Sequence, residues 1–217
     1  MGHSAFLRAR RPEHKQQRRE AILAAARELA LESGVRNVSL NSVAATVCLA
    51  KSNVVRYFGT REEIYLELAA EEWRDWADAV VGRLGADETP DGVVDALAET
   101  LLDRRLFCDL LSQMSTSLEH NVSVPAVGVF KRGVLGVVDE IAARIAEVYP
   151  ALSMGEAAEV VAAAAMFAGV LYPISNPPPP LVELYSREPE LAVACPPFLP
   201  TLKRFLMVAV TGLPTLR

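Results

Sequence analysis

Residues 39–63 read SLNSVAATVCLAKSNVVRYFGTREE, and this stretch predicts two short helices joined by a tight link, followed by the start of a longer helix. Ser39 is a suitable N-cap for the first helix, because its hydroxyl can accept hydrogen bonds from unpaired N–H groups of the first turn. We expect the second helix over about residues 51–57, and Gly59 ends it. Two helices of roughly seven residues are unstable alone in water, so they must pack on a larger scaffold.

The second short helix has one apolar side and one polar side. Val54 and Phe58 are expected to face the core. The outward Lys, Ser, Asn, Arg and Tyr side chains can donate hydrogen bonds to base edges and phosphates. We therefore interpret the pair as a helix-turn-helix whose second helix reads DNA. A capping box over residues 60–63 is expected to begin the next helix. The predicted DNA contacts are Arg18, Ser39, Lys51, Ser52, Asn53, Arg56, Tyr57, Thr60 and Arg61.

The same stretch carries four short motifs, which are Val43-Ala44, Leu49-Ala50-Lys51, Tyr57-Phe58 and Arg61-Glu62-Glu63-Ile64. In order and spacing they resemble the N-terminal domain of TetR-family transcriptional regulators, and the resemblance covers about residues 18–68. It implies a DNA-binding head followed by a larger helical domain that binds an effector and dimerises.

Three positions depart from the pattern of that family. Cys48 stands where the family usually has the turn glycine, and it fits the motif if the turn avoids a positive φ angle. Ala50 replaces the usual capping serine, and Val55 replaces the first aromatic residue of the family motif. Position 50 therefore lacks a hydroxyl and position 55 lacks an aromatic ring. The resemblance implies a phosphate contact from each of these groups, and this chain has no such group at either position.

Charge is distributed unevenly along the 217 residues. Residues 1–61 carry 11 Lys and Arg and 4 Asp and Glu, whereas residues 62–217 carry 11 and 23, which makes the net charge −5. A basic head on an acidic body orients the molecule toward a polyanion and makes binding dependent on salt. Arg8–Arg11 form a basic lead that either stays solvated or lies against DNA. A basic tail on an unrelated acidic domain is the alternative.

Composition predicts an all-α protein, because 51% of residues are hydrophobic, only 6% are aromatic, and alternating strand patterns are absent. We expect about nine helices, over residues 13–33, 39–47, 51–57, 60–84, 90–102, 104–118, 123–149, 153–171 and 198–211. The prolines of residues 176–180 should exclude helix there, and residues 181–196 should be irregular or form one short helix. The expected domains are a helix-turn-helix domain with a basic arm (1–62) and a helical effector-binding and dimerisation domain (63–217).

Other patterns exclude several classes of protein. The three cysteines are far apart and lack metal-ligand spacing, so we expect no metal, no cofactor and a reducing cytoplasm. The longest apolar run, residues 160–174, is shorter than the roughly 18 residues of a membrane span. No apolar signal segment follows the basic N-terminus. Enzyme motifs such as a phosphate-binding Gly loop or a nucleophile elbow are absent as well.

Small and apolar residues in the last two predicted long helices suggest close helix packing. Spacing alone leaves open whether they fill the core of one chain or an interface, and the resemblance implies a dimer held by a four-helix bundle. The expected interface residues are Ala158, Ala162, Ala165, Gly169, Leu202, Phe205, Leu206 and Ala209.

Large apolar residues of the middle helices can either form the core or line an effector cavity. The candidate effector residues are Trp73, Trp76, Phe107, Leu111, Met114, Phe130, Met166 and Phe167. The resemblance implies that an effector changes the tilt of the helix at 60–84 and releases DNA. The leading hypothesis is thus a homodimeric repressor of a palindromic operator, released by a small apolar effector. The alternatives are a DNA-binding protein without an effector, and an all-helical carrier or enzyme.

Overall fold

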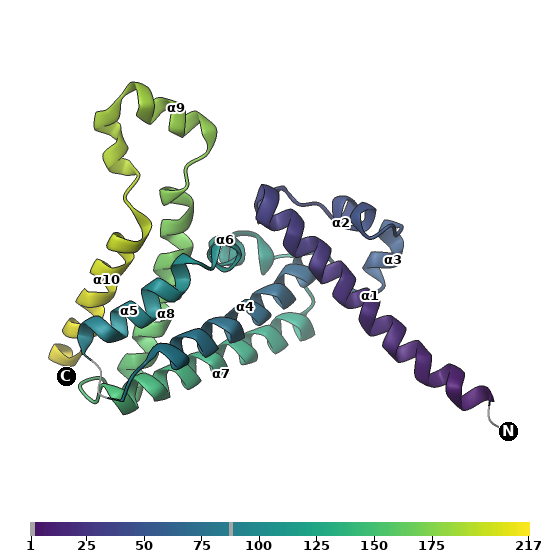
Figure 1. The fold of residues 1–217 in the computed structure, drawn as a ribbon, viewed down its shortest axis with the longest axis horizontal. Helices are drawn as coiled ribbons and strands as arrows, with labels where there is room; N and C mark the ends of the chain where they lie inside the picture. Colours follow the sequence, from purple (N-terminus) through teal and green to yellow (C-terminus); the bar gives the residue numbers. More distant parts are fainter. Residues whose placement is uncertain (1–2, 87–88) are drawn as a thin grey trace.

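The computed structural model describes residues 3–86 and 89–217, with side chains from residue 14 onward, and every regular element in these ranges is helical (Figure 1). This confirms the predicted all-α class. The α-helices are α1 (His3–Ser33), α2 (Leu40–Thr46), α3 (Lys51–Val55), α4 (Arg61–Arg83), α5 (Pro90–Leu102), α6 (Arg105–Gln113), α7 (Val124–Val148), α8 (Met154–Ser175), α9 (Pro179–Arg187) and α10 (Phe198–Gly212). The short turns are η1 (Val35–Asn37), the π-helical η2 (Met114–Leu118), η3 (Pro189–Ala194) and η4 (Leu213–Leu216).

The head consists of α1, α2 and α3, packed around a small apolar core against the first turns of α4. Its fully buried side chains include Ile22, Ala26, Val43, Val54 and Ile64. An ion pair holds α1 on α4, because Arg27 contacts the carboxylates of Glu71, at 2.8 Å, and Glu72. Glu72 is only 6% exposed, so this pairing is what allows its charge to be buried.

The body is built on α4, which continues from the head and lies beside α7 (Figure 1). α8 packs against α6, α7 and α10, and α10 also packs against α5. Three aromatic rings from α4 and α6 form the centre. The ring of Trp73 lies edge-on to those of Trp76 (5.4 Å between centroids) and Phe107 (5.3 Å). The indole N–H of Trp76 donates to Thr100 Oγ1 at 2.9 Å, which ties α5 to the same cluster.

The helix α8 extends beyond the predicted end at residue 171. It continues to Ser175 and includes Pro173 in its last turn. By length and composition alone α8 could cross a membrane, and 44% of its most apolar window is buried in the protein. Its contacts with α6, α7 and α10 are those of a core helix.

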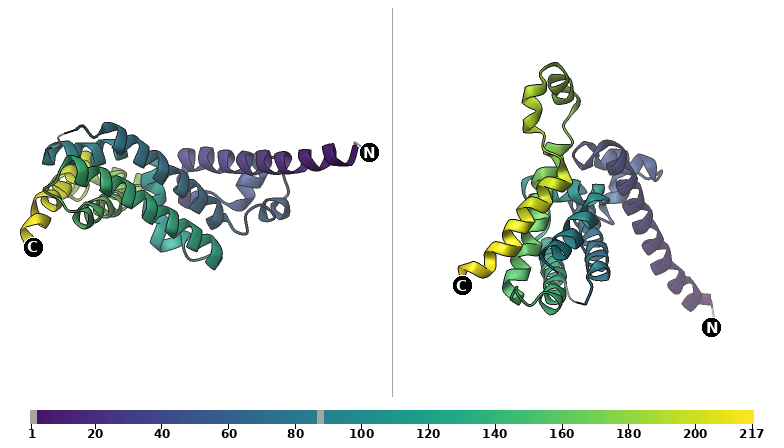
Figure 2. Two further views of the ribbon diagram at one scale, coloured as in Figure 1. Left: turned by 90° about the horizontal axis from the view of Figure 1, so that it is seen from below. Right: turned by 60° about the vertical axis from the view of Figure 1, so that its left-hand side comes forward.

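Residues 176–197, which we call the arm, connect α8 to α10 and project from the body (Figure 2). The arm contains α9 and η3. The prediction that residues 176–180 exclude helix is wrong at Pro179 and Pro180, because they occupy the first turn of α9, where the missing N–H of proline needs no partner.

Two further predictions differ from the structure. The first helix begins at His3 rather than near residue 13. The side chains of Arg8–Arg11 lie outside the described part, so their predicted DNA contacts stay untested. The helix expected over 104–118 is divided, because α6 ends at Gln113 and the π-helical turn η2 follows.

Candidate DNA-binding site

The turn between α2 and α3 contains an unusual backbone conformation. Cys48 has a φ angle of 52°, and among the described residues other than glycine it is the one with positive φ. The condition under which Cys48 would fit this turn without strain, a φ angle that is not positive, is therefore not met. The Leu49 N–H donates to the Ala44 carbonyl at 2.9 Å, which closes the turn in the shape that glycine normally provides. The helix-turn-helix therefore retains its turn at the cost of local strain in Cys48.

The polar face of α3 is held outward by residues on its opposite side. Val54 is fully buried and Phe58 is 3% exposed, as predicted. The polar side chains on the other side, which are exposed, are those of Lys51, Ser52, Asn53 and Arg56. α3 ends at Val55, two residues earlier than predicted, and Tyr57 lies half-buried in the following turn. Ala50 is the N-cap residue of α3 and has no side-chain cap hydrogen bond; its carbonyl accepts from the Asn53 N–H at 2.9 Å.

A groove of about 580 Å³ lies between α1 and α3. Its lining brings together positive charge and hydrogen-bond donors, from Lys15, Arg18, Leu49, Asn53, Arg56 and Tyr57. Arg18 and three residues of the predicted reader thus meet at one place. Lys15 was not among the DNA contacts predicted from the sequence. The spacing could have indicated this contact, because Lys15 precedes Arg18 by three residues and residues three apart share one face of a helix.

Two other arginines, Arg19 and Arg61, stabilise the fold rather than line the groove. Arg19 pairs with Glu67, donates from Nη1 to the Tyr57 carbonyl at 3.0 Å, and places its guanidinium 4.2 Å from the centre of the Phe58 ring. These contacts direct the guanidinium of Arg19 inward. It fixes the end of the reader segment against α1 and α4.

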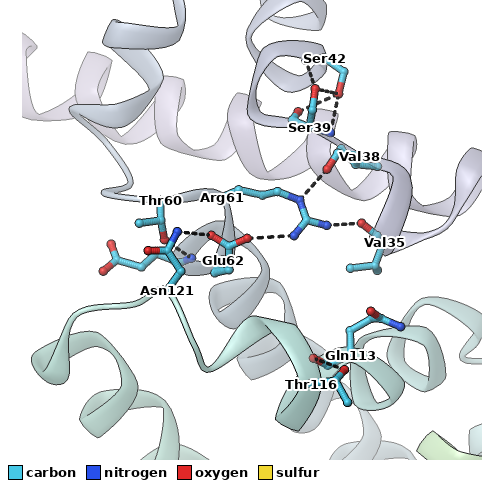
Figure 3. Close-up of polar contacts among 11 residues, drawn as sticks. Val35, Val38, Ser39, Ser42, Thr60, Arg61, Glu62, Gln113, Thr116 and Asn121 are labelled. Carbon is cyan, nitrogen blue, oxygen red and sulfur yellow. Dashed lines mark hydrogen bonds and ion pairs between the residues drawn. The ribbon is translucent and has the colours of Figure 1, made fainter.

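Arg61 is the second of these arginines (Figure 3). Its guanidinium donates to the carbonyls of Val38, at 2.5 Å, and Val35, and pairs with Glu62 at 3.1 Å. Its side chain is only 16% exposed. The prediction that Arg61 contacts DNA is therefore corrected, because its donors are used to hold the link before α2.

The hydroxyls of Ser39 and Thr60 cap helices. Ser39 Oγ accepts from the Ser42 N–H at 3.0 Å, which confirms it as the N-cap of α2, and Thr60 Oγ1 accepts from the Glu63 N–H at 3.1 Å (Figure 3). Each hydroxyl oxygen already accepts a cap hydrogen bond, so a contact with phosphate would have to form in addition to that bond. The second half of the capping box predicted at residues 60–63 is not formed, because Glu63 accepts from the Gly59 N–H instead.

The head and the body are joined by polar contacts at the start of α4. Glu62 Oε2 accepts from the side-chain amide of Asn121 at 3.1 Å (Figure 3). Glu63 Oε1 accepts from the Ser123 N–H at 3.0 Å. At the other side of the head, Asp109 of α6 accepts from the Val35 N–H at 2.7 Å. Movement of α6 or α7 can thus reach the reader through these bonds.

Half of the residues predicted for a dimer interface are buried inside the chain, which corrects their assignment. Gly169 packs so closely on Leu111 that an added Cβ would lie 3.0 Å from its backbone carbon. The others that are buried are Ala165, Leu202 and Leu206. The half-buried or exposed members are Ala158, Ala162, Phe205 and Ala209. The sequence missed large apolar residues that the structure exposes beside them, which are Met166, Val170, Ile174 and Val208.

The candidate effector residues also divide. Met166 is 65% exposed on α8, so it does not join the buried residues at the centre of the body. Trp73, Trp76 and Phe107 fill the centre of the body with one another. Phe130 is buried, and Leu111, Met114 and Phe167 are half-buried. The ring of Phe167 stacks on that of Phe205 at 4.9 Å, toward the α10 surface.

Comparison with known proteins covers both parts of the chain. The model of bacterial regulatory proteins of the tetR family matches residues 22–68, and that of the tetracyclin repressor-like C-terminal domain matches residues 70–217. No curated protein sequence matches the chain.

Two solved structures are similar in fold. A possible TetR family transcriptional regulator from Streptomyces coelicolor A3(2) shares 18% identity over 92% of this chain and 100% of its own, with a TM-score of 0.61. The fatty acid degradation regulator FadR from Bacillus halodurans shares 14% identity over 89% of this chain and 98% of its own, with a TM-score of 0.53. At such identities the likeness concerns the fold alone.

Proposed function

Since this chain belongs to the tetR family of bacterial regulatory proteins, and is therefore a transcriptional regulator rather than an enzyme, we propose that it represses transcription by binding a palindromic DNA operator as a homodimer. Its N-terminal helix-turn-helix is the DNA-binding part, and its C-terminal domain is the ligand-binding part.

The groove between α1 and α3 is the observation that carries this proposal. Lys15 and Arg18 of α1 supply charge for phosphates at one wall. Asn53 of α3 and Arg56, the residue that follows α3, supply side chains suited to bidentate hydrogen bonds with adenine and guanine, respectively. With α3 in the major groove, the base-reading and phosphate-binding groups contact neighbouring parts of one duplex.

The exposed apolar face of α8 and α10 supports the proposed homodimer. Met166 and Val208 are 65% and 66% exposed, and Phe205 is 45% exposed. Large apolar residues gathered on one face favour burial against another protein surface. A second copy also doubles the number of DNA readers, which are matched to half-sites about 34–36 Å apart.

We propose further that a small apolar effector binds the C-terminal domain in the cytoplasm and releases the DNA. The π-helical turn at Met114–Leu118 lies at the end of α6, and such turns are frequent at functional sites. The effector needs to favour the DNA-free state by about 1.4 kcal/mol to change occupancy tenfold. The bonds of Asp109, Glu62 and Glu63 with the opposite domain provide the route from body to reader.

Selection of bound sites from a random pool of duplex DNA tests the DNA-binding part of the proposal. We expect enriched sequences with two inverted half-sites one helical turn apart, and binding that weakens steeply with salt. Enrichment of a single, non-repeated site would contradict the homodimer. No enrichment, together with no binding at low salt, would contradict operator recognition altogether.

A further inference from the structure

The arm is the largest segment of the described chain that packs on almost nothing. No residue from 176 to 197 is buried, and α9 packs mainly on η3. Its exposed aliphatic side chains are those of Leu181 (39%), Val182 (54%), Leu191 (40%) and Val193 (86%). Exposure of these apolar side chains to water costs free energy, so their burial against a partner surface is favourable.

The base of the arm is closed, so the arm is a defined element. Ser175 Oγ donates to the Pro196 carbonyl at 2.7 Å, where the chain leaves α8 and returns to α10. The rings of Tyr172 and Phe198 meet edge-on at 6.4 Å across the same point. These contacts direct the arm away from the body (Figure 2).

The exposed apolar stripe of α8 leads directly into the arm. Met166, Val170 and Ile174 are 65%, 60% and 40% exposed, and their spacing of four places them along one face of the helix. The stripe ends at Ile174, two residues before the arm begins. A partner that covers the stripe comes within reach of the arm.

An apolar groove lies at the opposite end of the same face. It has a volume of about 560 Å³ and lies between the start of α8 and the end of α10. Its walls include Ala162, Ala163, Met166, Val208, Leu213 and Leu216. The groove and the arm are thus at the two ends of one surface.

The geometry of the proposed dimer brings these two ends together. Both readers must face one duplex, so the two-fold axis runs from the body toward the head. α8 lies across this direction (Figure 1), and a two-fold rotation therefore makes the α8 helices of two copies antiparallel. Val170 is the middle residue of the exposed stripe, so we centre the crossing there, which sets Met166 against Ile174 of the second copy. Eight residues from that centre, about 12 Å of helix, it places Ala162 against the base of the arm of the second copy.

We propose that the arm of each subunit docks into the apolar groove of the other, with Leu181 and Val182 as the inserted side chains. This inference rests on the proposed homodimer and adds a second, reciprocal contact to the four-helix interface. Each subunit then buries its arm only when the dimer forms, so the arm links dimer stability to the positions of α8 and α10.

Disulfide trapping in the full-length protein tests the contact. The background carries Cys48→Ser and Cys195→Ser, while Cys108 is buried and burial raises its pKa to about 12, so it does not react. One sample carries Ala162→Cys and the other Leu181→Cys, so any covalent link after mixing joins two chains. Val124→Cys, on the exposed start of α7, replaces Leu181→Cys in the control mixture.

The dimer dissociation constant gives an independent measurement. Val182→Glu places a charge in the groove of the partner, so we expect the constant to rise at least about tenfold, or about 1.4 kcal/mol. Val124→Glu is the matched control, because Val124 is 83% exposed and lies away from the proposed interface. It should leave the constant unchanged.

Each outcome decides between the two proposals. A dimeric parent protein, a link specific to positions 162 and 181, and weaker association of Val182→Glu support the arm contact. The arm contact is overturned, and the dimer is retained, if the parent is dimeric, the pair of positions 162 and 181 forms no more disulfide than the control pair, and Val182→Glu leaves the dissociation constant unchanged. A parent protein that remains monomeric overturns both.

Discussion

Glu63 accepts a hydrogen bond from the backbone N–H of Ser123 at 3.0 Å, and this bond joins the first turn of α4 to the start of α7. Its other carboxylate oxygen accepts from the Gly59 N–H, also at 3.0 Å. One side chain therefore contacts both the end of the reader segment and the body. The bond from Ser123 is the main reason that the pKa of Glu63 lies below the usual 4.5, with burial acting in the opposite direction.

Glu63→Gln should destabilise the protein by about 1 kcal/mol at neutral pH, the usual net value of a hydrogen bond. Because the folded-state pKa of Glu63 is lowered, its contribution is present above the unfolded-state pKa near 4.5 and is lost as the pH falls through the folded-state value. The difference between the variant and the parent should therefore shrink below about pH 4.5. Urea unfolding followed by circular dichroism, at neutral and acid pH, measures this.

Glu140→Gln is the control for this prediction, because Glu140 is exposed on α7. It should change stability little at either pH. An equal loss in both variants would show that the contact of Glu63 with Ser123 has no special role.

Lys15→Ala and Arg56→Ala should each weaken operator binding about tenfold while leaving the fold intact. Both side chains line the groove between α1 and α3. Loss of a phosphate contact by Lys15 should reduce the slope of log affinity against log salt by about 1. Fluorescence anisotropy over a salt series measures both effects. Arg132→Ala, exposed on α7, is the control and should bind normally. If all three variants bound alike, the groove would not be the DNA-binding surface.

Cys48→Gly should stabilise the protein by about 0.5–1 kcal/mol. The φ angle of 52° costs a non-glycine residue about 1–2 kcal/mol, and part of the gain is offset by the greater freedom of glycine in the unfolded chain. The midpoint of urea unfolding should therefore rise. Cys48→Ala keeps the Cβ atom and should change stability little. A lower midpoint for Cys48→Gly than for Cys48→Ala would contradict strain at this turn.

Gly169→Ala should destabilise the protein by about 1–3 kcal/mol, because the added Cβ lies 3.0 Å from the backbone carbon of Leu111 and α6 must shift. Gly133→Ala makes the same change in α7, where an added Cβ meets nothing within 4 Å. That variant should gain about 0.4–1 kcal/mol from the lower entropy of its unfolded chain. Thermal unfolding of the two variants compares them directly, and shifts of the same sign would contradict the close contact between α8 and α6.

Met166→Arg should produce monomers without unfolding the chain, because it places a charge in the middle of the proposed interface. Leu135→Arg is a matched control, since Leu135 is 63% exposed on α7 and Met166 is 65% exposed on α8. Light scattering measures the mass of each variant. A dimeric Met166→Arg protein would place the interface elsewhere.

The local pattern of residues was enough to predict the helical class, the reader and its caps. Ser39 and Thr60 cap the helices that follow them, as expected, because a cap depends on groups only three residues away. Val54 and Phe58 face the core for a similar reason, since helical spacing decides which side of a short helix is apolar. The positive φ of Cys48 was missed, because the sequence shows the residue but not the torsion angle that its neighbours impose.

Tertiary packing decided which side chains are available for binding. Arg18 and Arg19 are adjacent, yet Arg18 lines the groove whereas Arg19 pairs with Glu67, which follows it by 48 residues. Arg61 is likewise held by carbonyls 23 and 26 residues earlier. In α8, Gly169 is covered by Leu111 of α6, which precedes it by 58 residues. Spacing along one helix tells which residues share a face, but only contacts between distant segments determine whether that face is buried or exposed.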